Sequence, residues 1–347
     1  MIRFPSTLHA TADFVSLFRE GLRLSGVHEG EIVLIYSDTL TSPQYPAAFL
    51  AAARDLGAQA VQIVQPIVPH NLGPGGQRAT PTALIRDAMI AADMVVDVSS
   101  AGMLYANEQG RILESGTRIL RVREPEDCLQ RLMPSSEVRD RSIRGRARLQ
   151  SARTLRVVSD SGTDLILDKR GREVAIQYGM ADEPGRWDHW PTGMVNTTPV
   201  EETVEGNLVI TPASVIFPFG VYVSQPLTLR FRNGIAESID GGREAAMLED
   251  YIATANDVNC RRVSHIGWGT EHRARWSSLA TRGAEGGGGA EIRSIYAHVL
   301  IALGENRDLG GQNAAPLHVD ISLRDSRLEL DGATVLDSGR FLDQSLA

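Results

Sequence analysis

The segment Pro316–Leu323 (PLHVDISL) carries two side chains whose types and spacing suit metal binding. Its apolar residues alternate with other residues and include β-branched ones, a pattern that predicts a strand. Because strand residues two apart point to the same face, His318 and Asp320 would project together. An imidazole and a carboxylate so placed can bind a divalent metal, or can form a hydrogen-bonded pair at a sheet edge.

A third ligand is available in Val263–Thr270 (VSHIGWGT), whose alternation predicts another strand around His265. Together, His265, His318 and Asp320 supply two imidazoles and one carboxylate. This is the ligand set of the non-haem Fe(II) oxygenases, in which the remaining metal positions accept substrate and O₂. Hydrolysis at zinc uses the same ligand types and stays open as an alternative. His298, in an apolar segment, is better explained as a core histidine bonded to a carbonyl.

A proton carrier is suggested by Arg186–Pro191 (RWDHWP), predicted here as an aromatic-rich loop. Histidine side chains in general titrate near neutral pH, so His189 could move the proton of an aromatic hydroxyl. A purely structural role for His189 is equally open.

The first 135 residues alternate predicted strands and helices, which indicates a doubly wound, Rossmann-like α/β domain. The predicted strands are 31–36, 59–65, 94–98 and 118–122, and the predicted helices are 11–24, 45–56 and 80–91. The loop after the third strand, where Leu104 and Tyr105 lie, is a candidate substrate-binding lip or an ordinary loop. No G-x-G-x-x-G follows the first strand, so no nicotinamide cofactor is expected.

The residue pattern after position 135 predicts a linker and a second domain. Residues 136–153 form a basic linker, within a stretch holding seven arginines (139, 141, 144, 146, 148, 153 and 156). A solvated helix or a subunit contact explains this stretch better than RNA binding, since it lacks aromatic residues. Residues 154–347 contain short strands with turns and one helix at 244–256, which predicts a mostly antiparallel β, metal-binding catalytic domain. Glycines 286–289 predict a loop.

Composition narrows the function classes. Hydrophobic residues make up 42% of the 347, and charged residues 22%, as in ordinary globular proteins. A formal net charge of −8 argues against binding to nucleic acid or to an anionic membrane. Only two cysteines occur, so a disulfide framework and a thiolate zinc site are both unexpected. No signal-peptide pattern or membrane span is evident, and a cytoplasmic location is expected.

Four motifs follow one another in the order found in the aminopeptidase T family of metallopeptidases. They are Ser161–Leu165 (SGTDL), Pro191–Pro199 (PTGMVNTTP), Ser264–Thr270 (SHIGWGT) and Gly310–Asn313 (GGQN), the last leading to His318 and Asp320. The resemblance covers roughly residues 150 to 340, with a weaker match of the α/β half, and it implies that fold. The family carries glutamates where this chain has Met194 and His265, and a histidine at about Leu300. A chain so altered is not expected to hold two metals.

The altered ligand set is similar to that of the 2,5-dihydroxypyridine 5,6-dioxygenases, a resemblance that extends over nearly the whole chain and includes His189. It implies one Fe(II) per chain, O₂ as co-substrate, and ring cleavage to N-formylmaleamate in nicotinate degradation. It also implies a homo-oligomer, with a hexamer suspected. Under this resemblance His265, His318 and Asp320 hold the iron and His189 is the acid/base. Leu104, Tyr105 and Asn313 are candidate substrate contacts.

Two alternatives remain beside this interpretation. One is a metallo-aminopeptidase of the aminopeptidase T type, which the fold favours and the ligands disfavour. The other is a non-catalytic small-molecule binding protein built on the same fold.

Overall fold

The computed structural model describes residues 7–67, 81–100, 102–103, 107–282 and 289–347, and the chain divides into two compact units. The first unit takes in the described residues before position 136 together with Tyr178–Pro191. The second takes in Ser136–Gln177 and the described part of Thr192–Ala347. The sequence-based division kept 178–191 with the C-terminal domain. In the structure this segment joins the first unit because its strand extends the sheet there.

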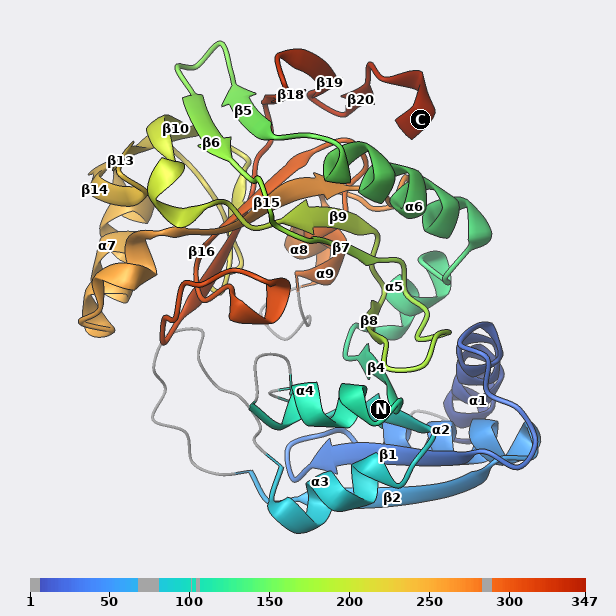
Figure 1. Cartoon of the computed structure of the whole chain (residues 1–347). Coiled ribbons are helices and arrows are strands. Elements are labelled where there is room, and N and C mark those ends of the chain that lie inside the picture. Colours follow the sequence, from blue (N-terminus) through green and yellow to red (C-terminus); the bar gives the residue numbers. More distant parts are fainter. Residues whose placement is uncertain (1–6, 68–80, 101, 104–106, 283–288) are drawn as a thin grey trace, which may run out of the picture. The chain divides into compact units, whose positions relative to one another are not determined.

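The first unit is built on a parallel sheet of five strands in the order β2-β1-β3-β4-β8 (Figure 1). The strands are β1 (Ile32–Asp38), β2 (Gln59–Gln65), β3 (Met94–Asp97), β4 (Arg118–Val122) and β8 (Trp187–Trp190). The helices are α1 (Thr7–Leu24), α2 (Gln44–Asp55), α3 (Ala83–Ile90), α4 (Asn107–Glu114) and α5 (Glu126–Arg131). Every strand and helix expected in this half is therefore present, and α4, α5 and β8 are additional.

Alternation along β1 explains why helices cover both faces of this sheet. Val33 and Ile35 pack into one core with residues of α1 and α2, such as Phe18 and Phe49. Leu34 and Tyr36 point the other way, into a second core with residues of α3 and α4. A parallel sheet buried on both faces is the doubly wound arrangement that the sequence predicts.

The second unit contains two antiparallel sheets. The eight-stranded sheet has the order β14-β13-β10-β6-β5-β18-β19-β20, and the seven-stranded sheet has the order β12-β11-β17-β16-β15-β9-β7. Their strands are β5 (Thr154–Val158), β6 (Asp164–Asp168), β7 (Val174–Gln177), β9 (Met194–Thr197), β10 (Glu205–Ile210), β11 (Val215–Ile216), β12 (Val221–Tyr222), β13 (Leu227–Arg232), β14 (Ile235–Gly241), β15 (Val263–Gly269), β16 (Val299–Gly304), β17 (His318–Ser322), β18 (Arg327–Leu330), β19 (Ala333–Asp337) and β20 (Arg340–Phe341). One continuous core includes side chains of both sheets.

Among the described residues of this unit, four α-helices accompany the sheets: α6 (Ser136–Gln150), α7 (Arg243–Thr254), α8 (Ser278–Arg282) and α9 (Ala290–Arg293). Short 3₁₀ turns occur at Glu201–Thr203, Val258–Arg261, Arg307–Leu309 and Gln344–Leu346. The arginine-rich stretch forms α6, which buries Val138, Arg141 and Leu149. The Arg141 guanidinium donates to the carbonyl oxygen of Thr270 over 2.8 Å. Residues 136–150 are thus a packed helix of the second unit and not a solvated linker.

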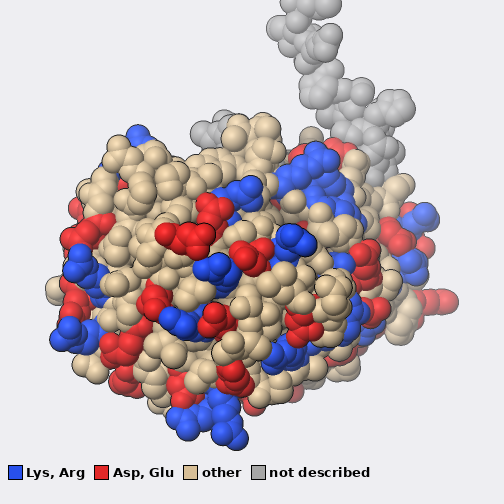
Figure 2. Space-filling view, turned by 90° about the horizontal axis from the view of Figure 1, so that it is seen from above, with Lys and Arg blue, Asp and Glu red and all other residues tan. Residues whose placement is uncertain are grey.

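Surface charge is mixed. Figure 2 shows acidic and basic side chains interspersed over most of the face it displays, as the modest net charge of −8 leads one to expect. None of the helices among the described residues has the length and apolar character needed to cross a membrane.

Candidate metal centre

Strand β17 places two candidate ligands on one face and two core residues on the other. Val319 and Ile321 are fully buried in the core of the second unit. His318 and Asp320 alternate with them, so they share the opposite face. The period of two that is visible in the sequence is therefore realised in the structure.

Small residues on the neighbouring strand leave room above these ligands. In the β16–β17 register, Ala302 lies opposite Asp320 and Gly304 lies opposite His318. A methyl group or a hydrogen at these positions cannot fill the space over the sheet. Gly304 also has φ of 95° and its backbone approaches Leu317 too closely for a side chain. The space is therefore open to a side chain from the next strand.

His265 reaches this space from β15, on the far side of β16. The β15–β16 register shifts between Val263 and Ile266, so three steps along β15 match two steps along β16. This extra residue is a β-bulge at Ser264–His265, a feature that redirects side chains and often lies beside functional sites. The bulge gives His265 an orientation that regular alternation does not determine.

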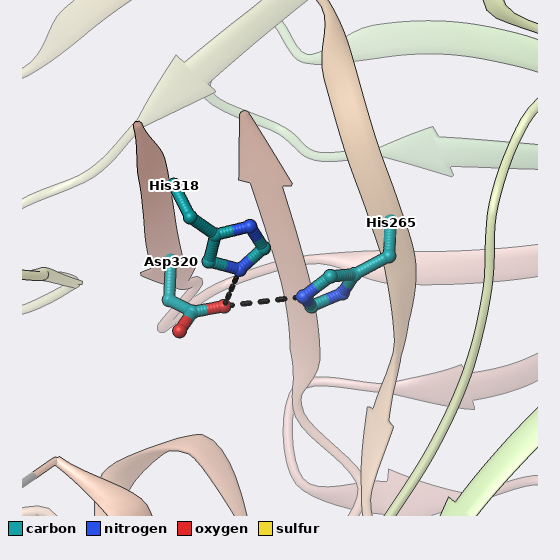
Figure 3. A group of neighbouring side chains, drawn as sticks. All are labelled: His265, His318 and Asp320. Atoms are coloured by element: carbon teal, nitrogen blue, oxygen red, sulfur yellow. Dashed lines mark hydrogen bonds and ion pairs between the residues drawn. The ribbon is translucent and has the colours of Figure 1, made fainter. Parts of the chain in front are cut away.

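The three side chains converge, as Figure 3 shows. The Nε2 atoms of His265 and His318 each lie 3.3 Å from Oδ1 of Asp320. One ligand atom from each residue lies within 4.8 Å of the other two, and all three side chains are at most 10% exposed. The two imidazole rings have centroids 5.1 Å apart and are nearly parallel. Among the described residues, this is the group of three or more potential ligands that could hold a metal ion.

Electrostatics keep this group ready to bind a cation. Burial lowers the pKa of His265, which favours the neutral imidazole that metals bind, although its hydrogen bond to Asp320 opposes the shift. Burial opposes ionisation of Asp320, but the charges of His318 and Arg293 outweigh it and hold the pKa of this carboxyl well below its usual range. The donor set is therefore one carboxylate with two imidazoles.

Arg293, at the end of α9, gives the two carboxylate oxygens of Asp320 different partners. Its Nη1 donates to Oδ2 over 2.6 Å, whereas Oδ1 faces the two histidines. A charge-assisted bond of this length orients the carboxylate so that one oxygen is directed at the centre of the group. Nothing in the local sequence around Arg293 indicated this role, because it depends on the packing of α9 beside β17.

His189 and Asn313 have different surroundings. His189 lies in strand β8 of the first unit, not in the loop expected from the sequence, and its backbone N–H donates to Asp188 over 2.8 Å. The carboxamide of Asn313 donates to the carbonyl oxygens of Gly304 and Asn259, which fixes the backbone after β16. Leu104 and Tyr105 lie outside the described residues, as do glycines 286–288.

Two of the three positions that separate this chain from aminopeptidase T, Met194 and Leu300, hold no histidine or carboxylate ligand. Met194 in β9 and Leu300 in β16 are both buried, apolar residues of the seven-stranded sheet. His298 precedes β16, and its ring hydrogen-bonds the carbonyl oxygen of Tyr296 over 2.8 Å, as expected of a core histidine. The group of His265, His318 and Asp320 therefore offers ligands for one metal ion.

Two features define the class of protein. The fold combines an α/β unit with a unit of two antiparallel sheets, and the seven-stranded sheet carries one His-His-Asp group. The solved structure of wild-type AmpT from Thermus thermophilus has the same fold, with a TM-score of 0.64 at 15% identity over 95% of this chain and 99% of that chain. At that identity the likeness concerns the fold alone. The expected aminopeptidase T-like architecture is confirmed, and it extends to the α/β half.

More specific similarity lies with one family. Residues 13–343 match the family model described as 2,5-dihydroxypyridine 5,6-dioxygenase. The curated enzyme of that name from Pseudomonas putida KT2440 is 34% identical over 338 residues, which is 95% of this chain and 96% of the relative. The solved structure of the dioxygenase from that strain matches with a TM-score of 0.91 over 97% of this chain and 99% of the other. The chain therefore belongs to the 2,5-dihydroxypyridine 5,6-dioxygenase family, and the dioxygenase interpretation is favoured over the aminopeptidase alternative.

Proposed function

We propose that this chain cleaves 2,5-dihydroxypyridine between ring carbons 5 and 6, using O₂ and one Fe(II), to give N-formylmaleamate in the aerobic degradation of nicotinate. The observation that carries this proposal is the convergence of His265, His318 and Asp320 in a chain of this family. Two neutral ligands and one carboxylate are the donor set of mononuclear Fe(II) oxygenases.

The residues present fit an Fe(II) ion. Nδ1 of His265 is buried without a hydrogen-bond partner among the described residues, which is unusual for a histidine retained only for structure. Its Nε2 and that of His318 both face Oδ1 of Asp320, so three donor atoms are directed at one point. When bound there, Fe(II) would supply a redox-active Lewis acid with positions open to the substrate and to O₂.

The chain's own residues have three tasks in this reaction. His265 and His318 would each present one ring nitrogen to the metal, which binds the deprotonated lone pair. Asp320 contributes a single negative charge, part of which Arg293 offsets. The low negative charge around the metal favours a substrate bound as an anion through a deprotonated hydroxyl. We assign the removal of that hydroxyl proton to His189, whose imidazole is the natural carrier near neutral pH.

The test is an anaerobic titration of metal-free protein with Fe(II), followed by admission of air and 2,5-dihydroxypyridine. We expect the ultraviolet band of the substrate and dissolved O₂ to disappear in equal amounts, and only after iron is added. Alanine at His265 or Asp320 should lower both iron content and ring cleavage, the latter by more than about 100-fold, since loss of even an indirect partner of a ligand costs 10–100-fold.

The matched control is His272→Ala, which removes a partly exposed histidine outside the metal group. It should retain iron and activity. The proposal fails if His265→Ala or Asp320→Ala keeps both iron and ring cleavage. Iron bound tightly with no loss of substrate or O₂ would reject 2,5-dihydroxypyridine as the substrate.

Assembly and location belong to the same proposal. We propose a homo-oligomer, with a hexamer as the expected form, in the cytoplasm. Cys128 and Cys260 are both buried free thiols, as suits a reducing compartment. Light scattering coupled to size-exclusion chromatography measures the assembly, and a monomer at micromolar concentration would contradict it.

A further inference from the structure

The two nitrogens of His318 face different partners. Nε2 lies 3.3 Å from Asp320, while Nδ1 lies 3.0 Å from the backbone carbonyl oxygen of Glu305. A carbonyl oxygen only accepts hydrogen bonds, so Nδ1 must carry the proton. When a metal replaces the proton that Nε2 shares with Asp320, the Nε2 lone pair is the one that faces the metal. A hydrogen bond of this kind to the second ring nitrogen is how proteins select the tautomer of a metal-binding histidine.

The Glu305 carbonyl oxygen that selects this tautomer also accepts a second hydrogen bond, from Ser264. The Ser264 hydroxyl donates to the Glu305 carbonyl oxygen over 2.6 Å, and its Oγ lies 3.4 Å from Nδ1 of His318. Ser264 is fully buried. Its hydroxyl therefore fixes the acceptor on which the orientation of the His318 ring depends.

Ser264 and His265 are consecutive, yet both contact His318. Consecutive residues of a regular strand point to opposite faces. Here the bulge in β15 removes that restriction, so the Ser264 hydroxyl approaches Nδ1 while the ring of His265 stacks against the imidazole. The bulge thus brings one ligand and the support of another ligand to the same side of the sheet.

The backbone of the bulge is held by Asn306, which is fully buried. Its carboxamide nitrogen donates to the carbonyl oxygen of Ser264 over 3.2 Å and to Oε1 of Glu201 over 3.1 Å. Glu201 also forms a buried ion pair with Arg172 and accepts the backbone N–H of Gln312. Hydrogen-bonded networks of buried polar groups are rigid when every member is satisfied.

We propose that Ser264 is a positioning residue for the metal centre: its hydroxyl, on a bulge braced by Asn306, holds the Glu305 carbonyl that keeps His318 in the Nδ1–H tautomer with Nε2 directed at the metal. This inference rests on the proposed function only in taking His318 as a ligand. It assigns to Ser264 no contact with substrate.

The test compares Co(II) binding to wild-type protein and to Ser264→Ala under anaerobic conditions. We expect the dissociation constant for Co(II) to rise by about 10- to 100-fold, the usual effect of losing a partner of a ligand. The visible absorption of bound Co(II) should also shift, because the orientation of the His318 ring is less restricted. Ser264→Cys retains volume and a weak donor, so its affinity should fall between the two.

The matched control is Ser142→Ala in α6. Ser142 is also fully buried in the second unit and loses one hydrogen bond, to Thr270, on substitution. Its Tm should change about as much as that of Ser264→Ala, while its Co(II) affinity and spectrum stay at wild-type values. If Ser264→Ala does not fold, Ser264→Cys carries the comparison alone.

The inference is overturned if Ser264→Ala, or Ser264→Cys in its place, binds Co(II) within about twofold of wild type with an unchanged spectrum, or if Ser142→Ala weakens binding equally. It is also overturned if wild-type protein binds no Co(II). Normal Co(II) binding that depends on Ser264, in a protein that does not cleave 2,5-dihydroxypyridine, would reject the proposed function and retain this inference.

Discussion

At the scale of single residues, His298 is a histidine whose surroundings require the neutral form. The Arg324 guanidinium, which can only donate, lies 3.1 Å from Nε2 of His298, so this nitrogen must accept. Nδ1 then donates to the carbonyl oxygen of Tyr296 over 2.8 Å. Burial lowers the pKa of His298, and the charge of Arg324 adds to the shift. Protonation would place a second positive charge against the arginine.

This arrangement predicts a pH dependence of stability. As pH falls below about 6.5, the unfolded chain takes up a proton that folded His298 does not, so the free energy of unfolding decreases until pH reaches the lowered pKa. His298→Asn should reduce that dependence by up to about 1.4 kcal/mol per pH unit in this window. Urea unfolding of metal-free protein from pH 7.5 to 5 measures it. An unchanged pH dependence in the variant would contradict the assignment.

At the scale of elements, the end of α6 depends on Lys169, the only lysine in the chain. Its ammonium donates to the carbonyl oxygens of Leu149 and Gln150 over 3.2 and 3.5 Å, at the last residues of the helix. The side chain is buried, which lowers the pKa of Lys169. A cation at this end of a helix satisfies unpaired carbonyls and interacts favourably with the helix dipole.

Lys169→Met should therefore lower the free energy of unfolding by about 1–3 kcal/mol, because buried carbonyls lose their donor. Lys169→Arg should not restore it, since a planar guanidinium does not fit the place of a compact ammonium. Arg170→Met is the control, because Arg170 is mostly exposed in its ion pair with Asp168, and it should change the free energy of unfolding much less than Lys169→Met does. Equal losses of unfolding free energy in Lys169→Met and Arg170→Met would show that the hydrogen bonds from Lys169 to the end of α6 do not stabilise the fold.

At the scale of the whole molecule, the chain leaves the first unit after residue 135, returns to it for Tyr178–Pro191, and leaves again. The returning segment is secured by Asp188, which is fully buried. Its carboxylate accepts the backbone N–H groups of Tyr178, Gly179 and His189 over 2.8–3.2 Å, and it pairs with Arg186 over 2.6 Å. One side chain thus holds both ends of the segment.

Asp188→Asn should lower the free energy of unfolding by about 3–5 kcal/mol, as expected when one member of a buried ion pair is removed. Hydrogen exchange should speed up at the amides of Tyr178 and Gly179 before it does so in the strands of the parallel sheet. Asp164→Asn, which breaks an exposed pair with Arg156, should cost at most about 1 kcal/mol. The expectation is wrong if exchange in 178–191 is unaffected.

Local pattern was enough to predict the elements and part of the site. Strands and helices carry their periodicity in adjacent residues, so the sequence predicts the α/β half, the antiparallel half and the shared face of His318 and Asp320. The predicted strand Val263–Thr270 offered His265 as the third ligand, and the resemblance to the dioxygenase family implied the same residue. The strand character of Trp187–Trp190 was missed because its parallel pairing partner lies more than sixty residues earlier in the chain.

Only the tertiary structure decided how these residues meet. The bulge at Ser264–His265, the small residues Ala302 and Gly304 opposite the ligands, and the bond from Arg293 to Asp320 all depend on the register between strands and on packing of α9. Sequence determines which side chains share a strand face through spacing along the chain. Which strands lie next to one another, and in which register, depends on burying one core across the whole unit, and this has no local signature.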